Sequence, residues 1–249
     1  MKLARLILPC CLLLLPAWPA QAVDLTSAIG AALKLLTAST LSDDNARTLA
    51  LDSIHATDAK NHVAPPSNPY SKRLARVTRD FQNEDGLALN FKVYLTKDVN
   101  ASCSADGSVR VYSGLMDMMN DDELRFVLGH EIGHARLGHT RKQLQLAYAT
   151  SALRDAAAAT GNQAAVQLSQ SAVGDLAETL LHAQFSQSEE TEADEYGVHF
   201  LRLHGFKLQG ALSAMSKIQT LSDDHSWLAD HPASSDRLAH LQQLVGAAP

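Results

Sequence analysis

The sequence predicts an α+β protein that is mostly helical and carries one small antiparallel sheet. The first observation is composition. Aromatic residues make up 5% of the chain and apolar residues 46%, with Ala and Leu abundant, which favours helices. The second observation is that strand-like alternation is confined to residues 87–112, whereas nearly all of the chain from Asp121 onward has the period of helices. The sheet should therefore be a small element within a helical protein.

Residues 1–22 are predicted to be a secretory signal peptide. Two basic residues precede an apolar run, and Ala20 and Ala22 are placed as a cleavage site requires. An uncleaved membrane anchor is the less favoured alternative, because the run is far shorter than the roughly 20 residues of a spanning helix. We expect an exported mature chain that begins at Val23 and has no transmembrane segment.

The mature chain is acidic and retains one cysteine. Removing residues 1–22 leaves 19 of the 21 basic residues against 27 acidic residues, a net charge of −8. This balance argues against nucleic acid as a partner, because phosphate backbones attract basic surfaces. Cys103 is the cysteine that remains, so we expect a buried, unreactive thiol and no internal disulfide.

The 227 mature residues are long enough to bury a full core, and no repeat or linker demands two domains. We expect one domain, in which residues 23–68 form an N-terminal helical extension and residues 69–249 form the core. The helices expected ahead of the sheet are Leu25–Ala38, Asp43–Lys60 with Ser42 as its cap, and Tyr70–Gln82, which follows the helix-breaking sequence APPSNP.

Alternation and turn signals predict the strands. Leu87–Thr96 alternates and contains aromatic and β-branched residues, as strands do. Asp106 and Gly107 are a turn signal between Asn100–Ser104 and Val109–Tyr112. These segments predict a small antiparallel sheet.

The stretch FVLGHEIGHARLGH, residues 126–139, lies on a predicted helix. Asn120 and Glu123 have the spacing of a capping box at its start. Apolar residues recur along one face of this helix, at Leu124, Val127, Leu128, Ile132 and Leu137. His130 and His134 are one turn apart on one side of the helix, where both imidazoles can reach one ion.

Glu131 has the position of a general base in such a site. It can stand beside the open coordination position and accept a proton from a metal-bound water. Gly129 and Gly133 each cost about 1 kcal/mol of helix stability relative to Ala, a cost that makes sense if another chain or a substrate passes close by. The alternative is chance, because a motif of three fixed residues arises in about 1% of chains of this length. A catalytic zinc also needs a third protein ligand.

Two segments can supply that ligand. His139 is near, but a third ligand on the following turn requires Gly three and His six residues after His134, and here they fall at four and five. The second segment is SEETEADEYG, residues 188–197, on another predicted helix.

The helix that contains residues 188–197 is expected to be capped by Ser186 and ended by Gly205. Glu190 and Asp194 share one face of it, so Glu190 can bind the metal while Asp194 accepts the ring N–H of a ligating histidine. The other acidic residues of this segment are expected to be solvated charges: Glu189, Glu192 and Glu195.

Three motifs in order carry a family resemblance: HEIGH at 130–134, ETEAD at 190–194 and HPASSDRL at 231–238. The chain from about Pro69 to Leu241 resembles the HtpX, BepA and LoiP group of zinc metallopeptidases, relatives of the CAAX prenyl proteases. The sequence VRVYSGLMDMMNDDELRFVLGHEIGH is most similar to the LoiP-like periplasmic branch. The transmembrane helices of the HtpX and prenyl-protease branches and the tetratricopeptide repeats of the BepA branch have no counterpart here.

The resemblance implies a zincin-like gluzincin fold, with the small sheet beside the active-site helix and residues 23–249 as one metallopeptidase domain. It implies one Zn²⁺ per chain, held by His130, His134 and Glu190. Glu131 is then the base, and Asp194 supports a ligand.

Three further assignments concern the substrate and the reaction intermediate rather than the metal. His231, in a loop before Pro232, is our candidate to stabilise the oxyanion, while a structural role and an inhibitory fourth ligand stay open. Arg237 is expected to be a substrate clamp or a support. The strand around Val99 to Ser104 contains Asn100 and Ala101, which resemble the family's Asn-Ala strand. It is expected to offer its edge to an extended substrate.

The segment 146–184 lies between the two metal-binding motifs, so it must leave the site and return to it. A helical hairpin packed on the core and a lid over the cleft are the two interpretations.

We expect a zinc endopeptidase that acts on exported, unfolded or misassembled polypeptides in a Gram-negative periplasm, with peripheral association with the outer membrane left open. The compartment follows from the predicted signal peptide, and the quality-control role is implied by the resemblance alone. The rival is a chaperone-like binding module with a structural zinc, against which Glu131 argues because a structural site needs no base. An aminopeptidase is a narrower rival, and no acidic anchor for a free amine is evident.

Overall fold

The computed structural model describes residues 25–160, 184–221, 226–232 and 235–247. The predicted signal peptide, its cleavage site before Val23 and most of the 146–184 segment lie outside these residues. The helices are α1 (Leu25–Ser39), α2 (Asp43–Lys60), α3 (Pro69–Val77), α4 (Ser113–Met118), α5 (Asp121–Arg136), α6 (His139–Ala159), α9 (Gln187–Leu203), α10 (Gln209–Ile218), α11 (Ser226–Asp230) and α12 (Ser235–Gly246). The strands are β1 (Asn83–Glu84), β2 (Leu87–Ala88), β3 (Asn90–Tyr94), β4 (Ala101–Cys103) and β5 (Ser108–Tyr112). The protein is mostly helical with small sheets, as predicted.

The main sheet has the strand order β3-β5-β4, and it is mixed. The predicted hairpin between β4 and β5 is present and antiparallel, but β3 pairs with β5 in parallel, so the prediction of a purely antiparallel sheet was wrong. The expected long strand divides at Leu89, because its first residues pair with β1 across a tight turn at Asp85 and Gly86, both with positive φ. After β3 the chain crosses to β4 at the far edge of the sheet and returns through a hairpin to β5 in the centre. Because β5 is antiparallel to β4, it runs in the same direction as β3.

Several helices begin at a residue whose side chain caps the helix N-terminus. Ser42 caps α2, and Asn120 with Glu123 forms the expected capping box of α5. Ser186 caps α9 through a second capping box with Glu189, which also pairs with Lys142 at 2.7 Å. The prediction that Glu189 is merely a solvated charge was therefore wrong.

Helix α3 is shorter than expected. It ends at Val77, where Thr78 donates its backbone N–H and its hydroxyl to the carbonyl of Leu74 and closes the last turn. The predicted continuation to Gln82 does not form.

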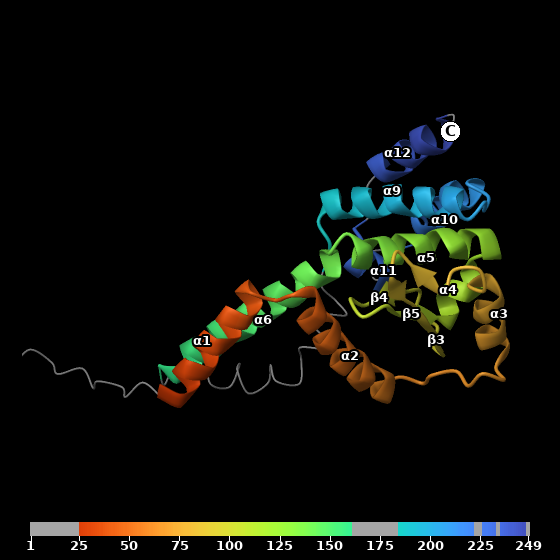
Figure 1. The fold of residues 1–249 in the computed structure, drawn as a ribbon. Coiled ribbons are helices and arrows are strands. Elements are labelled where there is room, and N and C mark those ends of the chain that lie inside the picture. Colours follow the sequence, from red (N-terminus) through yellow and green to blue (C-terminus); the bar gives the residue numbers. More distant parts are fainter. Residues whose placement is uncertain (1–24, 161–183, 222–225, 233–234, 248–249) are drawn as a thin grey trace, which may run out of the picture.

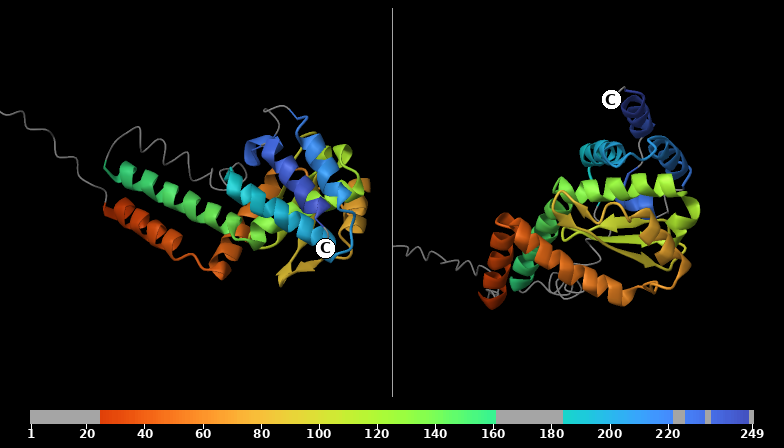
Figure 2. Two further views of the ribbon diagram at one scale, coloured as in Figure 1. Left: turned by 90° about the horizontal axis from the view of Figure 1, so that it is seen from above. Right: turned by 45° about the vertical axis from the view of Figure 1, so that its right-hand side comes forward.

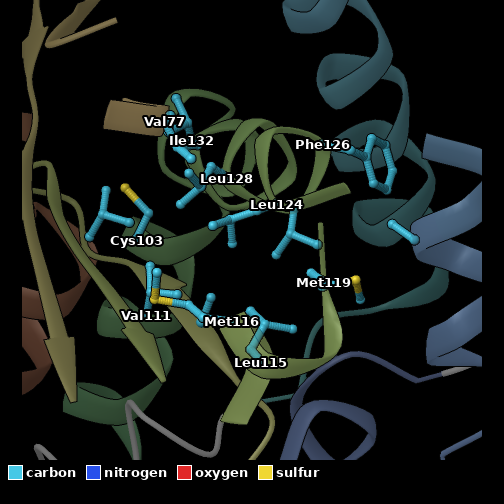
Figure 3. Packing of buried hydrophobic residues seen from close by; sticks show 14 of the residues in the cluster. Val77, Cys103, Val111, Leu115, Met116, Met119, Leu124, Phe126, Leu128 and Ile132 are labelled. Carbon is cyan, nitrogen blue, oxygen red and sulfur yellow. The ribbon is translucent and has the colours of Figure 1, made fainter. Parts of the chain in front are cut away.

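Helix α5 runs through the centre of the molecule and is buried on most of its sides (Figure 1). Figure 3 shows Leu124, Leu128 and Ile132 packed toward Val111 of the sheet, while Phe126 points to the opposite side. Leu137, predicted on the apolar face, is instead the C-cap and is 45% exposed. Cys103 packs into the same core, as expected, and burial raises its pKa well above the ordinary value of a thiol.

The helices form layers around α5. Helices α9 and α10 pack on one side of α5, and α12 packs outside them, while the main sheet lies on the other side (Figure 1). Helix α2 lies across the face of the sheet that is turned away from α5 (Figure 2). Helices α1 and α6 pack along each other as an arm that extends from this body. Within the described ranges, no helix combines the length and the apolarity needed to cross a membrane.

Candidate metal centre

His130 and His134 lie on one buried face of α5, and their Nε2 atoms are 3.1 Å apart. The spacing of four residues places one ring above the other, because an α-helix has 3.6 residues per turn. Glu131, which follows His130 directly in the sequence, is also buried, and burial raises the pKa of its carboxyl.

Glycines allow α9 to approach this face of α5 closely. A Cβ at Gly129 would lie 2.6 Å from Cδ1 of Phe200, and one at Gly133 would lie 3.0 Å from Cβ of Tyr196. These glycines therefore accommodate a neighbouring helix of the same chain. The close packing brings Glu190 to the histidines of α5.

Four donor atoms converge between α5, α9 and the loop after α11. The Nε2 atoms of His130 and His134 lie 3.6 and 3.4 Å from the Glu190 carboxylate. His231 Nδ1 lies 3.0 Å from Glu190 Oε1 and 3.4 Å from His130 Nε2. Ligand atoms about 2.0–2.1 Å from a tetrahedral ion are separated by about 3.3 Å, so the donor set fits a divalent ion such as zinc.

Burial and the neighbouring charges shift the pKa values of several groups in this cluster. Burial opposes ionisation of Glu190, but His231, His134 and His130 hold the pKa of its carboxyl far below the usual value. Burial also disfavours the charged form of His231, yet Glu190 and Glu131 raise the pKa of that imidazole to about 9. His134 shows the opposite behaviour, because burial lowers its pKa well below the ordinary value. Burial therefore favours the neutral form of His134, which is the form that metal ligation requires.

Asp194 and Arg237 support the donors from behind. His130 Nδ1 donates to Asp194 Oδ1 at 3.0 Å, which turns Nε2 of the same ring toward the cluster. Arg237 donates to both oxygens of Asp194 at 2.8 Å, and its Nη1 lies 2.6 Å from Glu190 Oε2. Although burial opposes it, the hydrogen bonds from Arg237 lower the pKa of Asp194. Arg237 is itself buried, and it contacts the carboxylates of both Asp194 and Glu190.

Glu131 and His231 face each other beside the donors. His231 Nε2 lies 3.3 Å from Glu131 Oε1, an atom that is buried and accepts no hydrogen bond within the described part of the chain. His231 is therefore placed both to touch the base and to complete the donor set. Trp227 stacks on its imidazole at 4.4 Å and fixes the ring plane.

Asn100 and Ala101 lie at the edge of the sheet near this cluster. The Asn100 amide donates to Asp230 at 2.8 Å and its oxygen accepts the backbone N–H of Ala101 at 2.8 Å. Asn100 thus ties the edge strand to α11. A small cavity beside this edge is lined by residues that include Ala101, Glu131 and His231.

Sequence reasoning assigned no role in the cluster to His139, Phe185 or Trp227. His139 Nδ1 lies 3.0 Å from His134 Nδ1, and His139 Nε2 lies 3.1 Å from Glu192 Oε2, so Glu192, predicted to be solvated, is linked to the site. The sequence spacing argued against His139 as a metal ligand. Its position only five residues after His134 was nevertheless a signal that the two side chains could lie close together. Phe185 stacks on His134 at 3.6 Å, and no motif pointed to it.

Comparison with known proteins gives one family. Residues 70–245 match the model of Peptidase family M48. The chain is 40% identical to the metalloprotease YcaL of Escherichia coli K12, over 90% of this chain and 89% of the relative. It is also 40% identical to the metalloprotease LoiP of the same organism, over 91% of both chains. A β-barrel assembly-enhancing protease of Yersinia pestis is 27% identical over 63% of this chain and 35% of the relative.

Proposed function

Because the chain belongs to Peptidase family M48 and is a metalloendopeptidase of the LoiP-like group, we propose that it uses zinc to cleave unfolded or misassembled proteins of the bacterial envelope. The observation that carries the proposal is the convergence of His130, His134 and Glu190 beside the buried Glu131.

His130, His134 and Glu190 would hold the ion, one per chain. When bound, a zinc ion would lower the pKa of a water and polarise the scissile carbonyl. Asp194 orients His130 through the hydrogen bond to Nδ1, and Arg237 keeps Asp194 ionised. Asp194 and Arg237 thereby hold His130 and Glu190 in place before substrate arrives.

Glu131 acts as the general base and later as the acid. Its carboxylate accepts the proton of the attacking water and passes it to the amine that leaves. Glu131 is buried beside the donor cluster, 3.3 Å from His231, in a position to reach the attacking water.

His231 is assigned to the oxyanion. Its imidazole, which lies 3.3 Å from Glu131 and 3.0 Å from Glu190, would donate a hydrogen bond to the negative oxygen of the tetrahedral intermediate. The same position next to Glu190 supports the alternative of an inhibitory fourth ligand.

The edge of β4 is assigned to the substrate backbone. An extended peptide adds to such an edge by main-chain hydrogen bonds, which select for unfolded chains and demand little sequence. Export into the periplasm follows from the predicted signal peptide. An envelope role is supported by the relative in Yersinia pestis, whose name refers to β-barrel assembly.

The test is cleavage of casein by the chain from Val23, with bound metal counted in the same sample. Glu131→Gln should keep the metal and lose at least about 10²-fold in turnover, because the base contributes that much. Glu195→Gln, an exposed glutamate of α9, is the matched control and should cleave normally. One metal per chain without cleavage by the wild-type protein would instead favour the non-hydrolytic binding module.

A further inference from the structure

We propose that α2 forms one wall of the substrate subsite next to Glu131, and that Ser53 and Ile54 restrict this subsite to Gly, Ala or Ser. This inference rests on the proposed peptidase function and specifies its substrates. It assigns a specificity role to a helix that precedes residues 70–245, the part of the chain that matches the family model.

A cavity of about 70 Å³ lies between α2 and β4. Ala50, Ser53 and Ile54 line it from α2, and the five residues Ala101–Ala105 line it from β4 and the turn that follows. Glu131 also lines this cavity. A side chain that enters from a peptide bound at the metal centre therefore meets α2.

The cavity passes the free edge of β4. Asp58 of α2 contacts Arg110, whose register partner on β4 is Ser102, so α2 covers that face of the sheet. Glu131 belongs to α5, which packs on the opposite face. A space that contacts both helices must run around the edge of β4.

Part of the backbone of β4 is directed away from β5. Tyr112 donates to the carbonyl of Asn100 and Ser104 donates to the carbonyl of Ser108, so residues 100, 102 and 104 pair with β5. In an antiparallel pair the alternate residues point their N–H and C=O groups to the other side. Ala101 and Cys103 accordingly direct theirs away from β5. The N–H of Ala101 is taken by the side chain of Asn100, so an extended substrate can pair with the C=O of Ala101 and with the N–H and C=O of Cys103.

Both ends of α2 are anchored, so it is a wall and not a loose flap. Asp58 accepts hydrogen bonds at 2.7 Å from Arg110, Lys92 and Tyr94 near the C-terminal end. Toward the other end, a small apolar cluster joins α2 to α6 through Leu41, Ala46, Ala50 and Leu144. The separation of α2 from β4 is therefore set by the fold.

The chemistry of the lining selects small uncharged side chains. The volume of about 70 Å³ admits only a few water-sized groups. On the side of α2 the lining is apolar at Ala50, Ile54 and Leu144, with the hydroxyl of Ser53 beside them. The charged lining residues are Glu131, Asp230 and His231, at the end next to the metal centre. Larger branched or aromatic side chains would collide with Ile54.

The experiment is digestion of unfolded casein, with the product termini sequenced by mass spectrometry. The wild-type chain should show Gly, Ala and Ser enriched at one position beside the cleaved bond. Ile54→Ala should raise cleavage at sites with Val, Leu or Met in that position by about tenfold, the scale of discrimination by a few methylene groups. Ser53→Leu, which fills the cavity, should lower cleavage at Ala sites about tenfold relative to Gly sites.

Leu51→Ala is the matched control. It makes a similar truncation on the same helix, but Leu51 is 43% exposed whereas Ile54 is 3% exposed, so the profile should not change. Melting temperatures of the variants verify that they fold. Unchanged profiles in both Ile54→Ala and Ser53→Leu would overturn the inference while leaving the peptidase intact. Absence of cleavage by every chain, wild type included, would overturn the proposed function and the inference with it.

Discussion

At the scale of single residues, the candidate metal centre depends on two glycines of α5 as well as on the residues that would bind the ion. Gly129 and Gly133 remove side chains where α5 meets Phe200 and Tyr196 of α9. The approach of the two helices brings Glu190 to the histidines. Each glycine weakens α5 as a helix, and interhelical packing compensates for that cost.

Gly129→Ala should therefore destabilise the protein although Ala favours helices. The added Cβ would meet the Phe200 ring at 2.6 Å, and overpacking of this kind costs about 1–3 kcal/mol against a gain of about 1 kcal/mol in helix propensity. Metal affinity should fall as well, because α9 carries Glu190. Chemical denaturation and metal titration measure both effects. Gly30→Ala in α1, where the new Cβ meets nothing within 4 Å, should stabilise the protein instead, and equal behaviour of the two variants would contradict this account.

His139 contacts His134, so we expect it to influence metal binding through that residue. Its ring lies between His134 and Glu192, so it fixes the orientation of a ligand without reaching the donor cluster. His139→Ala should weaken metal binding about 10–100-fold, as loss of a ligand's supporting partner does elsewhere. Competition with a chelating dye measures the affinity. His199→Ala, on the exposed side of α9, is the control, and the same affinity in both variants would remove His139 from the site.

At the scale of elements, α2 is held to the sheet by one carboxylate. Asp58 contacts Arg110, Lys92 and Tyr94, and Arg110 is almost completely buried. Burial raises the pKa of Asp58, but these hydrogen bonds outweigh it and hold the pKa well below the ordinary value. The ion pair thus stabilises the folded state when Asp58 is ionised.

Asp58→Asn should lower the free energy of unfolding by about 3 kcal/mol at pH 7, because Arg110 would stay buried without its counter-ion. A folded-state pKa below the unfolded value of about 3.9 stabilises the protein above that pH, and the stabilisation is lost as the pH falls. The difference between wild type and Asp58→Asn should therefore shrink below about pH 4. Urea denaturation between pH 7 and pH 3 measures it. Asp52→Asn, exposed on the same helix, should show little effect at any pH, and a constant difference for Asp58→Asn would argue against the ion pair.

At the scale of the whole molecule, the donor cluster links segments that are distant in the chain. His130 and His134 come from α5, Glu190 from α9, and His231 follows α11. A ligand that binds only the folded chain stabilises all of these elements together.

Removal of the metal should lower the melting temperature, and added zinc should restore it. The stabilisation amounts to about 4 kcal/mol when free metal exceeds the dissociation constant 1,000-fold. Scanning calorimetry with and without chelator makes the comparison. Glu190→Gln should respond far less to the chelator than wild type, while a wild-type protein indifferent to chelation would show that no structural coupling to an ion exists.

The sequence by itself determined the local features of this protein. The position of His130, Glu131 and His134 on one helix, and the caps at Ser42, Asn120 and Ser186, depend on residues within about one turn of each other. Such interactions are complete within a short segment, so they can be predicted without knowledge of the rest of the chain.

Only the tertiary structure decided how these segments meet. The parallel pairing of β3 with β5, the exposure of Leu137 and the contact of His139 with His134 were not predicted. Nor was the position of α2 across the face of the sheet that is turned away from α5. Each depends on which distant surfaces pack together, and that choice is made by the burial of the whole core rather than by any local pattern.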